Sequence, residues 1–269
     1  MNFIIELLMQ TCAYTLYLTG MIALTGLFLG ILRSNSIKNF QKSFGIKAVM
    51  LTGVIGVPIH ELSHAILAVV FGHKVTAIKL FQKPDENGVM GYVQHTYNPL
   101  SIYQQVGNLF IGVAPIFGGT LSIIVLMQFI IPKVYRQFIH ILMGNLSIIT
   151  LNKATIDGIL ISYGGLVKSI FALKNFANPY FYIFILIAIC ISSHISLSLA
   201  DIKGASRGIG VIFLIFLVLN IFSLSKYIVA INIIKYNILL IGFFIVAVIL
   251  SIITFLLSLF LLLIKRASI

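Results

Sequence analysis

The sequence predicts an all-α polytopic membrane protein of about six transmembrane helices, with a membrane-associated β-hairpin after the second helix. Of its 269 residues, 60% are hydrophobic and only 9% are charged, which excludes an ordinary soluble domain. Apolar runs of roughly 20 residues, the length that crosses a bilayer, recur along the chain. The 18 Lys and Arg exceed the 6 Asp and Glu, but they are dispersed over short loops as topology signals. We therefore expect a surrounding lipid bilayer and no nucleic-acid partner.

Six apolar segments have the length of a spanning helix. They cover residues 12–32, 47–72, 105–131, 178–200, 209–232 and 237–264. Between the third and fourth, residues 136–175 contain short apolar pieces interrupted by polar residues, so interfacial or re-entrant helices, or one more crossing, are expected there. No repeat or linker divides the chain, which predicts a single integral membrane domain over 1–269. The Ile-rich and Lys-rich composition with short loops is typical of a bacterial plasma-membrane protein.

Residues 73–97 carry a hairpin pattern instead of a helical one. VTAIKLF and GVMGYVQ are rich in β-branched and aromatic residues, and the turn formers Pro84, Asp85, Asn87 and Gly88 lie between or beside them. The pattern predicts antiparallel strands over Val75–Phe81 and Val89–His95.

Two apolar segments contain residues that shape helix geometry. Pro58 removes a backbone donor just before His60, which predicts a kink in the second segment. In the third segment, GVAPIFGGT at 112–120 places Gly112, Gly118 and Gly119 where a neighbouring helix can approach closely.

The second apolar segment contains the HExxH pattern, His60-Glu61-Leu62-Ser63-His64. Histidines four residues apart lie on one helix face and can bind the same Zn²⁺, while Glu61 reaches a water in the open position of the metal as general base. With 6 His and 3 Glu in the chain, the pattern arises by chance roughly once or twice in a thousand such sequences. It predicts one zinc ion per chain. The alternative is a polar cluster in which His and Glu satisfy one another without metal.

A catalytic zinc site usually has three protein ligands, so one lies outside the motif. In ISSHISLSLADIKGA, His194 and Asp201 are seven residues apart and hence close to one helical face. Asp201 is a candidate ligand or a solvated residue at a helix end, His194 is the alternative ligand or an oxyanion stabiliser, and Gly204 is expected to let the chain turn. A helix face, a turn or a membrane boundary explains most of the remaining acids and histidines, and one falls in the ambiguous middle segment: Glu6, His73, Asp85, Glu86, His95, His140 and Asp157.

These two polar islands resemble the site-2 protease (M50) family of intramembrane zinc metalloproteases. The similarity consists of HExxH in an apolar span, a predicted hairpin directly after it, and an Asp followed closely by Gly near the end of a later span. It covers roughly residues 50–205, within a predicted catalytic core of 47–205. The resemblance implies that His60, His64 and Asp201 bind zinc, that Glu61 is the general base, and that the substrate is a membrane-embedded segment of another protein.

The sequence therefore predicts a zinc-dependent intramembrane endopeptidase that acts on a membrane protein or peptide. The hairpin is expected to offer an edge to which an unwound substrate segment adds as a strand. The alternative is a non-catalytic binding or assembly protein that keeps a metal-binding or satisfied polar HExxH cluster. Glu61 favours the enzyme, because a structural zinc site closes its fourth position and needs no such base. A transporter would show inverted repeats, and the sequence shows one motif-bearing half.

Overall fold

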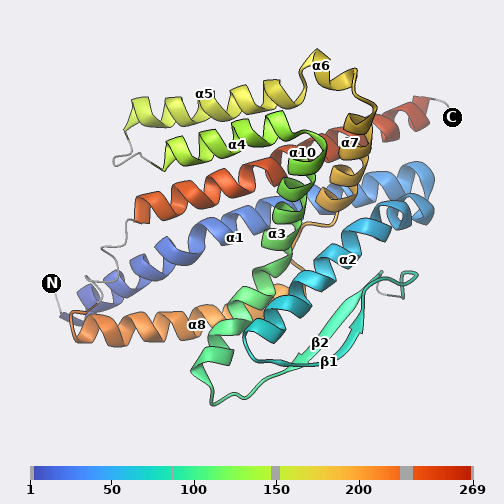
Figure 1. The fold of residues 1–269 in the computed structure, drawn as a ribbon. Helices are drawn as coiled ribbons and strands as arrows, with labels where there is room; N and C mark the ends of the chain where they lie inside the picture. The colour runs from blue at the N-terminus through green and yellow to red at the C-terminus, as the bar shows by residue number, and fades with distance from the viewer. Residues whose placement is uncertain (1–2, 87, 147–151, 225–232, 268–269) are drawn as a thin grey trace.

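The computed structural model describes residues 3–86, 88–146, 152–224 and 233–267, which are mostly helical (Figure 1). The helices are α1 (Phe3–Phe44), α2 (Ile46–Val70), α3 (Ile102–Ile130), α4 (Pro132–Asn145), α5 (Lys153–Ile170), α6 (Leu173–Phe176), α7 (Pro179–Ser192), α8 (Leu199–Ile221) and α10 (Ile233–Ala267). Between α2 and α3, strands β1 (Lys74–Lys79) and β2 (Tyr92–Thr96) form an antiparallel two-stranded sheet. The predicted hairpin is confirmed, although its strands are shorter than expected. Asn87 lies outside the described residues.

Six helical segments in the described part of the chain are long and apolar enough to cross a membrane. They are Phe3–Phe44, Ile46–Val70, Ile102–Ile130, Lys153–Phe176, Leu199–Ile221 and Lys235–Ala267. The predicted class of mostly helical polytopic membrane protein is therefore confirmed. Of the two alternatives for 136–175, the length and apolarity of Lys153–Phe176 favour an additional crossing.

The prediction of a fourth span over 178–200 is wrong. Helix α7 ends at Ser192 after 14 residues, the chain is not helical from 193 to 198, and α8 begins at Leu199. The break has a local cause, because the Ser198 hydroxyl accepts a hydrogen bond from the Asp201 amide and starts a new helix. Asp201 therefore opens a helix instead of closing one.

Two further boundaries differ from the prediction for the same reason. Gly204 lies inside α8 and not at a turn, and the fifth span begins ten residues earlier than the predicted 209–232. Residues 225–232 of that predicted span lie outside the described residues.

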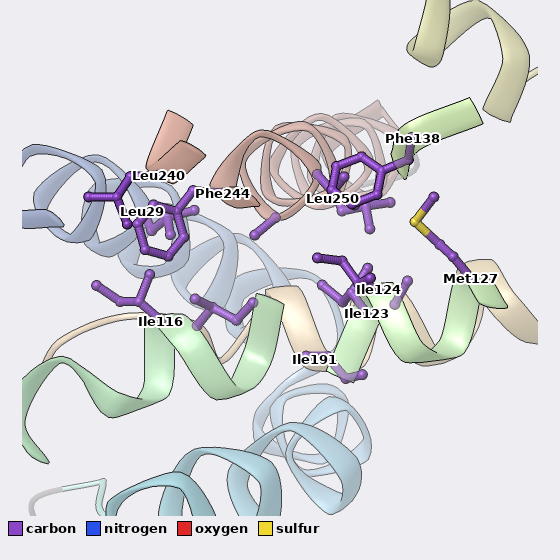
Figure 2. Close-up of a cluster of buried hydrophobic side chains, with 14 of the residues drawn as sticks. Leu29, Ile116, Ile123, Ile124, Met127, Phe138, Ile191, Leu240, Phe244 and Leu250 are labelled. Carbon is purple, nitrogen blue, oxygen red and sulfur yellow. The ribbon is translucent and has the colours of Figure 1, made fainter. Parts of the chain in front are cut away.

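Helix α3 is the centre of the bundle. Figure 2 shows its residues Ile116, Ile123 and Met127 among buried side chains of α1, α4, α7 and α10, including Leu29 and Phe244. In the apolar window of α3, 61% of the residues are buried, against 50% or fewer in the other spans. Helix α3 can therefore hold several elements in fixed positions relative to one another.

The glycines of α3 set how closely its neighbours approach. A Cβ atom at Gly112 would lie 2.6 Å from the Asp201 carbonyl oxygen on α8, and one at Gly118 would collide with Ser63 on α2. A Cβ at Gly119 would meet Ile195. The predicted close packing at these glycines is confirmed, and it brings α2 and α8 to the same central helix.

We expect Gly112→Ala to destabilise the protein by about 1–3 kcal/mol, because the new methyl group would displace the backbone at Asp201. Gly210→Ala on α8 is the matched control, since nothing lies within 4 Å of a Cβ there. Thermal unfolding of both variants in detergent measures the difference. Equal midpoints for the two variants would contradict the close contact between α3 and α8.

Candidate metal centre

The HExxH residues lie on α2, where the helical repeat places His60 and His64 one turn apart on one face. Their Nε2 atoms are 3.3 Å apart. Pro58 lies inside the helix one turn before Glu61 and His60 reach the site. Glu61 and His64 are buried and His60 is nearly so, so these polar side chains are largely removed from solvent and from lipid.

Asp201 reaches the two histidines from the first turn of α8. The Ser198 amide donates to its Oδ2 at 2.6 Å, and its own amide donates to the Ser198 hydroxyl at 3.1 Å, forming a capping box. This pair of bonds holds the carboxylate with Oδ1 3.2 Å from His64 Nε2 and Oδ2 3.8 Å from His60 Nε2.

Both histidines are oriented by backbone carbonyl groups. His60 Nδ1 lies 3.0 Å from the carbonyl oxygen of His194, and His64 Nδ1 lies 2.8 Å from that of Ile111. A carbonyl oxygen only accepts, so each Nδ1 carries the proton, and in a neutral ring Nε2 then presents its lone pair. Metal-binding histidines are oriented in this way.

The donor set fits a divalent metal ion. His60, His64 and Asp201 each offer one ligand atom, and these atoms lie within 4.8 Å of one another. Ligand atoms at about 2.0 Å from a tetrahedral zinc ion are separated by about 3.3 Å, close to the 3.3 Å between the two Nε2 atoms. Among the described residues, no second group of three such side chains converges in this way.

The side chain of His194 points away from this donor set. Its Nε2 lies 3.2 Å from the hydroxyl of Thr52, which itself donates to the Val49 carbonyl. His194 Nε2 is therefore the donor, and its Nδ1 is buried without a hydrogen-bond partner. Of the two candidates for the third ligand, the structure brings Asp201 to the histidines, whereas His194 contributes its backbone carbonyl to His60.

The excluded histidines form a separate pair outside the spanning helices. His73 Nε2 donates to the Gln104 carbonyl at 2.8 Å, so its Nδ1 accepts from His95 Nδ1 at 2.9 Å. Because α2 ends at Val70, His73 is absent from the donor set since it lies beyond the helix, and not because it lies on the opposite helix face as predicted. Burial, followed by the charges of His73 and His64, lowers the pKa of His95. The neutral pair ties β2 to α3.

A cavity of about 650 Å³ adjoins the donor set, between α2, α3, α8 and the segment 88–95. Sequence reasoning missed two residues that line it, Arg33 and Asn108. Arg33 was assigned to a loop because the first apolar run ends near 32, whereas α1 continues to Phe44. Asn108 is a single amide inside an apolar segment, and no pattern distinguishes it from a helix-packing residue.

Comparison of the chain with protein-family models, with curated proteins and with solved structures finds no match. The donor geometry, and not kinship, is therefore the observation on which a functional proposal can be built.

We expect detergent-purified protein to hold one zinc ion per chain, and Asp201→Asn to lose it because the amide is a poor zinc ligand. His194→Ala should keep the zinc, since the backbone carbonyl that orients His60 survives the substitution. Elemental analysis of both variants at matched folding quality makes the measurement. Zinc retained in Asp201→Asn and lost in His194→Ala would reverse the ligand assignment.

Proposed function

We propose that the chain is a zinc-dependent intramembrane endopeptidase, acting on a membrane-embedded or membrane-proximal peptide segment. The observation that carries the proposal is the convergence of His60, His64 and Asp201, with Glu61 beside them, on helices that have the length and apolarity of membrane spans. The composition supports a bacterial plasma membrane as its location. The resemblance to site-2 proteases agrees with the same residues.

His60, His64 and Asp201 would hold the zinc ion, and their burial fixes their positions. When bound, zinc polarises a substrate carbonyl group and makes a water molecule more acidic. Glu61 lines the same cavity, where its carboxylate can take the proton of the attacking water and deliver it to the leaving nitrogen. Water and a peptide both fit, because the cavity of about 650 Å³ lies within the usual size range of ligand sites.

The hairpin is the element best placed to hold the substrate. Residues 88–93 line the cavity, so the backbone of β2 and of the residues before it runs along the site. A Cβ at Gly91 would lie 2.8 Å from Glu61 Cγ, which means that this backbone packs directly against the proposed base. Helical peptides are poor substrates since their carbonyl groups are already hydrogen-bonded. Pairing with a strand edge would hold an unwound segment in extended form beside Glu61.

We expect Glu61→Gln to lower hydrolysis by about 10²–10⁴-fold, because the amide cannot accept the proton. Zinc content should stay at the level of the unchanged protein, since Glu61 is not in the donor set. A library of fluorogenic membrane-spanning peptides in lipid nanodiscs provides the assay, with chelator-treated protein as the control. No zinc-dependent hydrolysis by the unchanged protein would favour the non-catalytic reading, in which His64 and Asp201 are simply paired at 3.2 Å.

Proline at the cavity-facing edge of β2 should abolish hydrolysis while zinc stays bound. Successive strand residues direct their amides to opposite sides, so one of Tyr92 and Val93 presents its N–H to the free edge. Proline is tolerated at such an edge position because no bond to β1 is lost. The two substitutions are each other's control, measured as zinc content and peptide hydrolysis. Full activity in both variants would rule out strand addition at this edge.

A further inference from the structure

Arg33 is a charged side chain within α1, a helix long and apolar enough to span a membrane. Its Nε atom is buried and has no hydrogen-bond partner. The ion pairs found among the described residues join Asp201 to His60 and to His64, and Arg33 takes part in neither. Charged residues at membrane depth persist where they meet a partner or a ligand. The partner of Arg33 is therefore to be sought in the cavity that it lines.

The acids of the cavity do not satisfy Arg33. Asp201 uses Oδ2 to accept from the Ser198 amide and directs Oδ1 to His64 Nε2. Glu61 attracts the guanidinium electrostatically but forms no ion pair with it among the pairs that the described residues make. Both carboxylates are thus left for the metal and the proton transfer, and the guanidinium stays available.

The charge of the loaded cavity favours an anionic ligand. Its lining contains one guanidinium, that of Arg33, and two carboxylates, those of Glu61 and Asp201, for a formal charge of −1 with neutral histidines. A bound dication changes this charge to +1. In a site of low dielectric constant, a net charge of this kind is stabilised by a counter-ion of opposite sign.

Further unpaired donors line the same cavity. Asn108 Nδ2 and Ser196 Oγ are buried without hydrogen-bond partners. Buried polar groups in native proteins are nearly always hydrogen-bonded, so several exceptions around one cavity indicate a ligand that supplies acceptors. Ordered water would satisfy the amide and the hydroxyl, but the guanidinium requires a negative charge. The planar fork of Arg matches a carboxylate through two parallel hydrogen bonds.

We propose that Arg33 is the carboxylate-binding residue of this cavity and determines its specificity. The substrate is then a peptide with a carboxylate near the bond presented to the metal, either a free C-terminus or an Asp or Glu side chain. The inference rests on the proposed function in so far as the cavity holds the substrate, but binding can be measured without hydrolysis.

The test uses zinc-loaded Glu61→Gln protein in detergent micelles, so that no peptide is consumed. The probes are a short fluorescent Ala/Leu peptide with a free C-terminal carboxylate, its C-terminal amide, and amidated forms with one internal Glu or Gln. Fluorescence anisotropy should show one carboxylate form binding at least about tenfold more tightly than its neutral counterpart. The form that is preferred identifies the source of the carboxylate.

Arg33→Gln in the same background should remove this preference while zinc content stays unchanged. Arg207→Gln is the matched control, because Arg207 is an exposed arginine on α8 and its loss should leave the preference intact. Equal affinities for carboxylate and neutral peptides, or a preference that survives Arg33→Gln, would overturn the proposal. If Arg33→Gln does not fold, Arg33→Lys decides, since lysine cannot supply the paired bonds and an unchanged preference would exclude Arg33.

The outcomes separate the two proposals. A carboxylate preference that depends on Arg33 in a protein that hydrolyses nothing would support the binding site and remove the protease proposal. Hydrolysis with no carboxylate preference would do the reverse.

Discussion

Two backbone carbonyl groups determine what the polar cluster of α2 can do. The carbonyls of Ile111 and His194 accept the Nδ1 protons of His64 and His60, so the only remaining ring nitrogens carry lone pairs. Those lone pairs face each other and the Asp201 carboxylate. Such acceptors, buried together, repel one another unless a cation lies between them. The orientation of two imidazole rings thus turns an HExxH pattern into a metal-binding geometry.

The rest of the bundle supplies those two carbonyls at the required places. Ile111 belongs to α3, the most buried helix, and the neighbouring Gly112 lets α8 approach with Asp201. His194 follows α7, where Gly56 of α2 allows close contact, since a Cβ there would collide with the Cys190 carbonyl and the His194 side chain. Small residues at helix contacts therefore act on the site through backbone distances, with no side chain of their own in it.

Sequence reasoning predicted the features that depend on local pattern. The helical class, the hairpin and the close packing at the glycines of α3 follow from periodicity, turn residues and residue size. The break before Asp201 was missed because apolar composition continues through it, and composition alone cannot distinguish a capping box from a helix interior. Arg33 was missed because its position depends on how far α1 continues past its apolar run. The two carbonyl partners of the histidines lie 47 and 134 residues away in sequence, and no local pattern encodes them.

The break between α7 and α8 performs two tasks that a continuous helix could not. Non-helical backbone inside an apolar region is tolerated where protein buries it or where it lines a cavity, and Ser193, His194 and Ser196 are all buried. Leaving the helix frees the His194 carbonyl to accept from His60. Restarting the helix places the amide end of α8 at Asp201, where the helix dipole and the Ser198 amide stabilise a negative charge. One interruption in the chain therefore yields both a proposed ligand and the partner that orients another.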